Sequence, residues 1–329
     1  MFSVIIPLYN KAPYVEKAIR SVAAQTFREF ELIVIDDGST DIAAPQPPKG
    51  GAGLTYSDIE QLIDGKGILI KQKNSGVSTA RNNGVALANY PYICFLDADD
   101  WWASTFLEEM KALIEEFPEA GIYGSSYYKV KRGQNVPANI GVEDGFKKGL
   151  VNYCQVYAKT LWMPLWTGAV IMAKSVFDEE HGFKPALKLG EDFDLWIRVA
   201  MKHPVAFLNK PLAYYNQDVD QTSRGVVDEK IYNPSEFITF NLDFLAEEER
   251  IDSNVKSLLD RLRVYSLLRY RIQGKYKDMV EKVISGVDFN NVERKYYFYY
   301  HMPQFLLNLW FSFLKIGSRM KRLLSNFLN

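Results

Sequence analysis

The amino-terminal hundred residues alternate short apolar runs with stretches of helical periodicity. Phe2–Ile6 and Glu31–Ile35 are runs of strand length that end at a proline and at two aspartates. Between them, apolar residues recur at the three- and four-residue spacing of a buried helix face, at Val15, Ala18, Ile19 and Val22. Two strands joined by a helix predict a βαβ unit, with Asn10 as the helix cap and Pro13 in the first turn.

The same alternation continues and predicts an α/β fold. Further strands are expected at Gly67–Lys71, Tyr92–Leu96 and Ile122–Val130. Helices are expected at Val77–Ala88, Thr105–Phe117 and Asp192–Met201, with a shorter one near Tyr56–Leu62, and the pattern from Asn233 onward is mostly helical. Ala43–Gly53, rich in Pro and Gly, predicts an irregular loop. Such alternation builds a mainly parallel sheet flanked by helices, whose ligands bind beyond the carboxyl ends of the strands.

Composition places the chain among packed globular proteins. It has 329 residues, 47% hydrophobic and 24% charged, which suits about two domains. Two cysteines, Cys94 and Cys154, and three scattered histidines exclude a disulfide framework and a zinc-ligand spacing, so a cytoplasmic setting is expected. No basic stretch precedes the first apolar run, so no signal peptide is expected.

The net charge of -1 hides an uneven distribution. Residues 256–329 hold 14 Lys and Arg against 5 Asp and Glu, whereas residues 1–255 hold 25 against 35. A basic, aromatic segment predicts attraction to an anionic membrane surface, at the inner face of the cell membrane, whereas nucleic acid is not an expected partner.

The end of the chain suits an interfacial helix. Phe305–Leu314 is shorter than the roughly 20 residues that span a bilayer. Cations lie beside large apolar residues in and after this segment, as in an interfacial amphipathic helix. The cations are Lys315, Arg319, Lys321 and Arg322, and the apolar residues are Trp310, Phe311, Phe313, Leu323, Leu324 and Phe327. The alternative is that these aromatic side chains pack on the rest of the chain or form a dimer contact. The oligomeric state is not predicted.

An acidic cluster follows the strand that ends near Leu96. Phe95–Asp100 reads FLDADD, with three carboxylates in four positions. This charge requires a cation, and Mg²⁺ commonly takes one or two carboxylates together with substrate phosphates, which suits a nucleotide diphosphate site. The alternative is an acidic turn that caps the following helix.

A second acidic cluster begins an amphipathic helix. In LGEDFDLWIR, Glu191, Asp192 and Asp194 lie at or near the helix start. The helix terminus favours an ionised carboxylate, which could accept a proton from a substrate hydroxyl. The alternative is an ordinary N-cap aspartate.

Four segments, in order, carry a family resemblance. SVIIPLYNKAPYVEKAIRSVAAQTFREFELIVIDDGSTD, NSGVSTARNNG, FLDADD and GEDFDLWIR together resemble the signatures of family 2 glycosyltransferases, over roughly residues 2–224. The resemblance implies a GT-A fold. Residues 1–104 would form the nucleotide-sugar-binding half, residues 105–232 the acceptor-binding half with the catalytic base, and residues 233–329 a helical, basic and aromatic extension.

The resemblance also assigns residues. It places Pro7, Tyr9 and Asp37 around the nucleoside base, with Tyr9 stacking and Asp37 hydrogen-bonding, and it places Arg81 near the nucleotide. The alternatives are roles in a turn and in packing for Pro7, Tyr9 and Asp37, and a solvated charge on a helix for Arg81. Asp36 is expected to support its strand end.

Asp97 and Asp99 match the DxD motif of the family. Asp99 is expected to bind a divalent metal, Mn²⁺ or Mg²⁺, and Asp97 to share it or contact ribose, while Asp100 supports the turn. Asp192 matches the general base. Because Tyr214–Asp218 contains no histidine, unlike some relatives, the third metal ligand is unassigned.

The implied reaction is an inverting transfer from a nucleotide-diphosphate sugar, with a UDP-sugar as the expected donor. The acceptor would be a hydroxyl of a glycan or lipid-linked saccharide in bacterial surface polysaccharide synthesis, with Asp192 taking its proton. Trp162 and Trp166 would form either a sugar-stacking wall or part of the core.

Two alternatives remain open. A nucleotidyltransferase would need a loop that grips a triphosphate, and neither a Walker nor a Rossmann glycine motif is present. A catalytically silent nucleotide-sugar-binding or scaffold protein at the membrane surface would not need the intact Asp97, Asp99 and Asp192.

Overall fold

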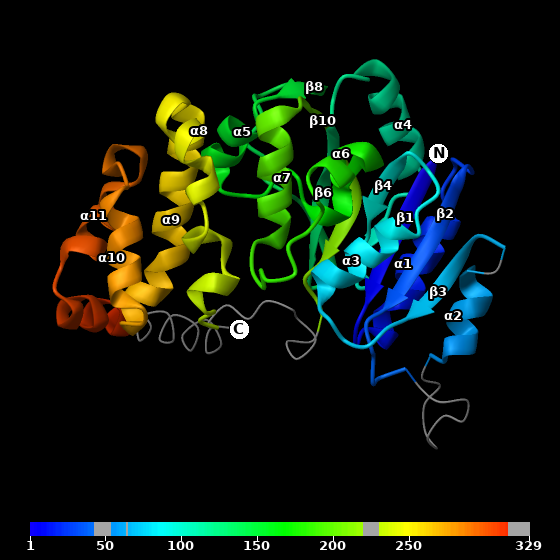
Figure 1. The fold of residues 1–329 in the computed structure, drawn as a ribbon, viewed down its shortest axis with the longest axis horizontal. Helices are drawn as coiled ribbons and strands as arrows, with labels where there is room; N and C mark the ends of the chain where they lie inside the picture. Colours follow the sequence, from blue (N-terminus) through cyan, green and yellow to red (C-terminus); the bar gives the residue numbers. More distant parts are fainter. Residues whose placement is uncertain (43–53, 64, 220–229, 315–329) are drawn as a thin grey trace, which may run out of the picture. The chain divides into compact units, whose positions relative to one another are not determined.

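The chain divides into two compact units, Met1–Val227 and Asp228–Asn329 (Figure 1). The computed structural model describes residues 1–42, 54–63, 65–219 and 230–314. The predicted loop at 43–53 and the basic residues from Lys315 onward lie outside the described residues. The division at residues 104 and 232 stays a prediction.

The first unit is built on one sheet of ten strands. Four parallel strands lie in the order β3-β2-β1-β4: Gly67–Lys71, Phe30–Asp36, Phe2–Leu8 and Tyr92–Phe95. The order continues as β9-β6-β10-β5: Val170–Ala173, Ile122–Lys131, Val205–Asn216 and Trp101–Trp102, with β9 antiparallel to both of its neighbours. β7 (Gln134–Pro137) and β8 (Lys148–Val151) add to β6 and β10. The expected α/β sheet flanked by helices is confirmed, and its second half is mixed.

The two faces of β1 pack on different helices because successive side chains of a strand point to opposite faces. Phe2, Val4 and Ile6 belong to a core shared with α1 (Ala12–Ala23), α2 (Tyr56–Ile63) and α4 (Phe106–Glu116). Ile5 faces α3 (Val77–Ala86), where a Cβ on Gly84 would lie 2.4 Å from its Cγ2. Only glycine lets this helix approach the strand so closely, and Figure 1 shows α3 lying across β1 and β2.

The predicted strands and helices of this unit are found within about two residues of the expected ends. The predicted helix cap is wrong. Lys11, not Asn10, precedes α1 and its side chain caps nothing. Asn10 has a φ of 50° and accepts from the N–H of Thr40 at 2.8 Å, while Asp41 accepts from the first helical N–H, that of Ala12, at 2.9 Å. The cap therefore comes from a loop that is distant in sequence.

The remaining helices of the first unit are α5 (Tyr153–Thr160), α6 (Lys174–Glu179) and α7 (Glu191–Lys202). α7 follows Gly190, whose φ of 79° turns the chain sharply into the helix. Buried Leu195, Trp196 and Val199 hold its inner face, so its first turn is fixed by packing and not by a side-chain cap.

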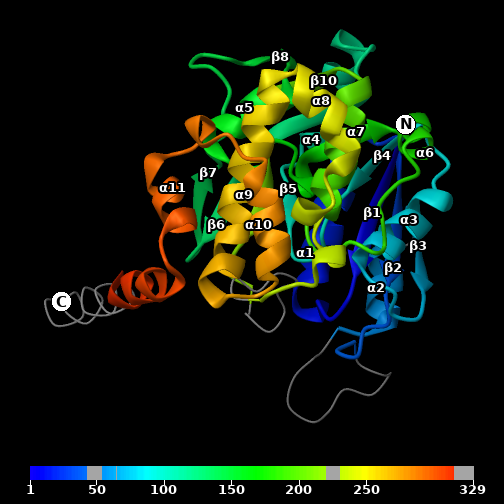
Figure 2. The same cartoon turned by 60° about the vertical axis from the view of Figure 1, so that its left-hand side comes forward.

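The second unit is helical, as expected from Asn233 onward. It contains α8 (Ala246–Ile251), α9 (Ser253–Gln273), α10 (Lys277–Ser285) and α11 (Arg294–His301), followed by a helix over residues 304–314. α9 and α10 pack side by side (Figure 2). Among the residues that the structure describes, none of the helices combines the length and apolar character that crossing a bilayer demands.

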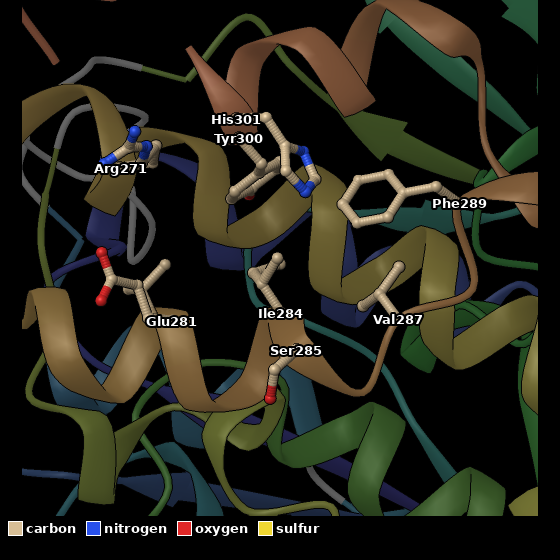
Figure 3. Close-up of a pocket in the computed structure, with 9 residues that line it drawn as sticks. Arg271, Glu281, Ile284, Ser285, Val287, Phe289, Tyr300 and His301 are labelled. Carbon is tan, nitrogen blue, oxygen red and sulfur yellow. The ribbon is translucent and has the colours of Figure 1, made fainter. Parts of the chain in front are cut away.

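The second unit also holds a hollow of about 340 Å³ between α9, α10 and α11 (Figure 3). Phe289, Tyr300 and His301 line one side, and Arg271 and Glu281 lie at one end. None of the predicted site residues contributes to it.

Candidate functional site

The predicted site residues gather at one edge of the sheet. β1, β2 and β4 are parallel, so their carboxyl ends meet there. Tyr9 and Lys11 follow β1, the pair Asp36–Asp37 ends β2, and the cluster Asp97–Asp100 follows β4. The parallel pairing of these strands therefore brings three separate sequence motifs together at one surface.

Asp36 and Asp37 use their carboxylates to hold neighbouring segments. Asp36 accepts from the hydroxyl of Tyr56 at 2.7 Å, and burial together with this aspartate raises the pKa of Tyr56 to about 12. Asp37, 3% exposed, accepts from Gln72 Nε2 at 2.7 Å and from the N–H groups of Ser75 and Gly76 at 2.8 Å. Asp37 thus fixes the loop that leads into α3, and its expected contact with a nucleoside stays a prediction.

Pro7 is buried, whereas Tyr9 is exposed. Pro7 is buried in β1, next to Ile35 of β2. Tyr9 is 47% exposed, so its ring is accessible for stacking on a planar group. Their nucleoside contacts stay predictions.

Arg81 brings the two acidic motifs together. Its guanidinium donates to Asp97 Oδ1 at 2.8 Å and to Glu191 Oε1 at 3.3 Å, and it is only 4% exposed. Burial alone would lower the pKa of Arg81, but Asp97 and Glu191 outweigh it and raise that pKa. Asp192, adjacent to Glu191, therefore lies in the same charged cluster as the aspartates that follow β4.

The rest of the NSGVSTARNNG segment positions this arginine. Asn82 donates to the carbonyl of Phe183 at 2.8 Å and accepts from its N–H at 3.0 Å, which ties α3 to the segment that leads into α7. Asn83 donates to Gln72, the residue that holds Asp37. The hydrogen bonds of the Asn82 side chain thus help to set the distance between Arg81 and the start of α7.

Lys11 is a functional candidate that the sequence reasoning missed. Its ammonium forms an ion pair with Asp99, and both side chains are mostly buried. Burial raises the pKa of Asp99, Lys11 opposes that rise, and Asp97 adds to it. The available signal was its place, since Lys11 lies in the turn after β1 at the same edge as the acidic cluster.

Asp100 ties the segment after β4 to the end of β10, and its expected support of the turn stays a prediction. It is 2% exposed and accepts from the N–H of Asn216, at the end of β10, at 2.7 Å. Burial, then Asp99 and Asp97, raise its pKa well above the usual range. The third aspartate of FLDADD therefore joins the two halves of the sheet.

Asp192 has an unusual protonation equilibrium for an aspartate. Burial raises its pKa to about 7, and Glu191 adds to the effect, whereas Arg81 and the N–H of Phe193 oppose it. Thr167 Oγ1 lies 3.4 Å from Asp192 Oδ2. A carboxylate with this pKa is well matched to accept a proton near neutral pH.

Three buried tyrosines lie close enough to Asp192 for its charge to act on them. They are Tyr127, Tyr153 and Tyr157, and burial raises the pKa of each, with a smaller contribution from Asp192. The hydroxyl of Tyr153 has no hydrogen-bond partner among the described residues. Asp192 therefore lies in an environment that is largely aromatic.

The neighbouring Asp194 is excluded as the base. It is fully buried and accepts from Lys184 Nζ at 2.8 Å and from Arg198 at 3.0 and 2.7 Å.

Of the two tryptophans, Trp166 is 6% exposed and packs against Tyr127, so it belongs to the core. Trp162 is partly buried beneath the ammonium of Lys129.

The carboxylates of Asp97 and Asp99 fit a divalent metal in part. Each ion pair with Arg81 or Lys11 uses one carboxylate oxygen and leaves the second. Among the described residues, no group of three or more His, Cys, Asp or Glu side chains could hold a metal ion. Two carboxylates match the protein's share of a Mg²⁺ site that is completed by phosphates and water.

Comparisons with known proteins agree with this architecture. Residues 3–154 match the family described as Glycosyl transferase family 2. An uncharacterized glycosyltransferase of Rickettsia felis is 32% identical over 218 residues, which is 64% of this chain and 32% of the relative. The amylovoran biosynthesis glycosyltransferase AmsB of Erwinia amylovora is 33% identical over 120 residues, 36% of this chain and 38% of AmsB. The match thus spans about a third of the length of each relative.

The fold is shared with a solved structure. The crystal structure of S. aureus TarS 1-349 in complex with UDP-GlcNAc superposes with a TM-score of 0.67 and 19% identity, over 88% of this chain and 82% of that chain. This likeness covers the α/β sheet with its flanking helices. From the matched domain, its ordered motifs and this architecture, residues 3–154 are similar to the family 2 glycosyltransferases, and the chain has the GT-A fold.

Proposed function

We propose that this chain transfers a sugar from a nucleotide-diphosphate sugar, with a UDP-sugar as donor, to a hydroxyl acceptor with inversion at the anomeric carbon. The observation that carries the proposal is the Arg81 bridge, which sets the base candidate Asp192 beside the DxD aspartates. A donor held at one motif would thereby face a base at the other.

The side chains of this protein would supply proton transfer and positioning. As the acceptor oxygen attacks the anomeric carbon, its proton passes to Asp192 and the bond from that carbon to the diphosphate oxygen breaks. General-base assistance of this kind is commonly worth about 10²–10⁴ in rate. Tyr9 would stack on the nucleobase, and Asp37 would hydrogen-bond to it through the lone pairs that its loop contacts leave.

A divalent metal, Mn²⁺ or Mg²⁺, would be held by Asp99 and Asp97 and would supply charge stabilisation on the departing diphosphate. Lys11 forms an ion pair with Asp99. Arg81 is engaged by two carboxylates and buried, so it acts by fixing their positions.

The identity of donor and acceptor draws on the relatives. TarS was solved with UDP-GlcNAc and with UDP, which supports a UDP-linked donor. AmsB is named for amylovoran biosynthesis, which supports a glycan or lipid-linked saccharide acceptor in surface polysaccharide synthesis. A peripheral position at the inner face of the cell membrane would bring the site to such an acceptor.

The test compares D192N with the wild-type chain and with D178N, a matched change at an exposed aspartate of α6. UDP binding is measured by calorimetry with Mn²⁺, and UDP release is measured from a panel of UDP-sugars. D192N should bind UDP normally and lose at least about 100-fold in turnover, while D178N keeps both. Wild-type turnover in D192N would refute the assignment of the base.

The same experiment separates the alternative function. A catalytically silent nucleotide-sugar-binding protein would bind UDP and release none from any UDP-sugar, in wild type and variant alike. D99N with Mn²⁺ completes the set, because loss of metal-dependent UDP binding is expected only if this aspartate holds the metal at the donor site.

A further inference from the structure

The helix over residues 304–314 is anchored to the second unit through one side. Gln304 donates to the carbonyls of Arg271 and Ile272, at the end of α9, at 2.8 and 3.1 Å. Leu307 is fully buried. The ring of Phe311 packs edge-on against a tyrosine of α11. The inward side of the helix is therefore held by one amide and two apolar contacts.

The opposite side exposes a continuous row of large apolar residues. Positions 305, 309 and 313 repeat at four-residue spacing, as do positions 306, 310 and 314, so the six share one half of the helix. Their exposed fractions run from 41% to 69%, at Phe305, Leu306, Leu309, Trp310, Phe313 and Leu314. A helix that exposes its apolar half is the reverse of an ordinary surface helix, and such a patch marks an interaction surface.

The sequence on both sides of this helix is basic, and this charge favours one partner. No acidic residue follows Glu293 in the sequence, whereas six cations do: Arg294, Lys295, Lys315, Arg319, Lys321 and Arg322. Pairing this face with the same face of a second copy would bring like charges together, which is unfavourable. An anionic surface with an apolar interior complements both features at once.

We propose that this apolar face lies in the headgroup region of an anionic bilayer, parallel to its plane. The eleven described residues of this helix measure about 16 Å, roughly half of the hydrocarbon thickness, which suits a segment that lies along the interface. Trp310 lies among aliphatic and Phe side chains, a composition typical of the interface. The inference extends the proposed function, since a lipid-linked acceptor would be met at such a surface.

The test measures partition of the full-length chain onto vesicles of phosphatidylcholine alone and of phosphatidylcholine mixed with phosphatidylglycerol. The wild type should bind the mixed vesicles at least about tenfold more tightly, because each cation near an anionic surface contributes about fivefold. F305S/L309S/F313S should lose at least about tenfold on the mixed vesicles. The control F244S/I251S/M279S alters three other exposed apolar residues of the same unit, which are 41% to 67% exposed, and should bind as the wild type does.

Other outcomes would overturn the proposal. These are absence of vesicle binding, equal binding to both vesicle types, or unchanged binding of the helix variant. If the wild type did not bind vesicles but formed a concentration-dependent dimer, and F305S/L309S/F313S abolished that dimer while the control variant did not, the face would be assigned to a second copy of the chain. Circular dichroism checks that each variant folds. UDP release from a UDP-sugar without vesicles reports the proposed transferase activity separately, so failure of one proposal does not resemble failure of the other.

Discussion

The pKa of Asp192 gives the most direct test of the proposed mechanism. A base must be ionised to act, and burial and Glu191 raise this pKa to about 7. At about pH 6 only roughly a tenth of the molecules would carry an ionised Asp192, so kcat/KM for the donor should fall to about a tenth of its plateau. An ordinary aspartate would stay ionised across this range.

Glu191→Gln is the perturbation that tests the cause. Glutamine keeps the oxygen that accepts from Arg81 but removes the like charge beside Asp192. The positive charge of Arg81, shared with one carboxylate fewer, then acts more strongly on Asp192. Both effects lower the pKa of Asp192, so the acidic limb of the rate profile should move to lower pH. If that pKa reached about 6, the relative rate at about pH 6 would increase about fivefold.

The assay is the initial rate of UDP release across the pH range in which the fold is stable. E60Q, on the exposed face of α2, is the matched control and should leave the profile unchanged. A wild-type limb below about pH 5, near the ordinary aspartate range, would contradict the link between burial and base strength. Movement of the E191Q limb to higher pH would contradict the assigned role of Glu191.

Three further predictions concern binding and stability. Lys11→Met should strengthen Mn²⁺ binding roughly tenfold, because a charge-assisted bond worth about 1.5 kcal/mol no longer competes with the metal for Asp99. Calorimetry that shows unchanged or weaker Mn²⁺ binding would contradict this prediction. Gly84→Ala should lower the free energy of unfolding by about 1–3 kcal/mol, since its Cβ meets Ile5 at 2.4 Å, and urea unfolding measures the loss. The raised pKa of Asp192 contributes stability that is present below the pKa of this group in the unfolded chain and is lost as pH rises through about 7. Relative to D192N, the free energy of unfolding of the wild type should therefore fall by up to about 1.4 kcal/mol per pH unit between about pH 5 and 7. Parallel curves of stability against pH for the two proteins would contradict this prediction.

Local sequence predicted the elements because their apolar periodicities survive in the folded core. Gly67–Lys71 is found as predicted, and α7 extends the predicted Asp192–Met201 by one residue at each end. The failure at Asn10 has a non-local cause. Its left-handed conformation is stabilised by Thr40, thirty positions away, and such a contact leaves no trace in the local pattern.

The sequence indicated that acidic residues and Arg81 would lie at this edge of the sheet, but it did not indicate which cation pairs with which carboxylate. Acidic residues that follow strands can be predicted to lie together, because parallel strands end at a common edge of the sheet. The Lys11–Asp99 pair spans 88 positions, and the Arg81–Glu191 pair spans 110. Which cation neutralises which carboxylate depends on sheet order and on Asn82 holding the segment before α7. These arrangements are tertiary.

The charge balance of the site explains why donor and metal would bind together. Two acidic motifs converge on Arg81, while Lys11 compensates only Asp99. Carboxylates therefore outnumber the cations that face them, and the raised pKa values of Asp99 and Asp192 express that excess together with burial. A nucleoside diphosphate alone would add negative charge to a site that already repels it. On the proposed assignment, Asp97 and Asp99 would hold a divalent ion whose charge offsets that of the diphosphate, while Asp192 would remain available to take the proton of the acceptor.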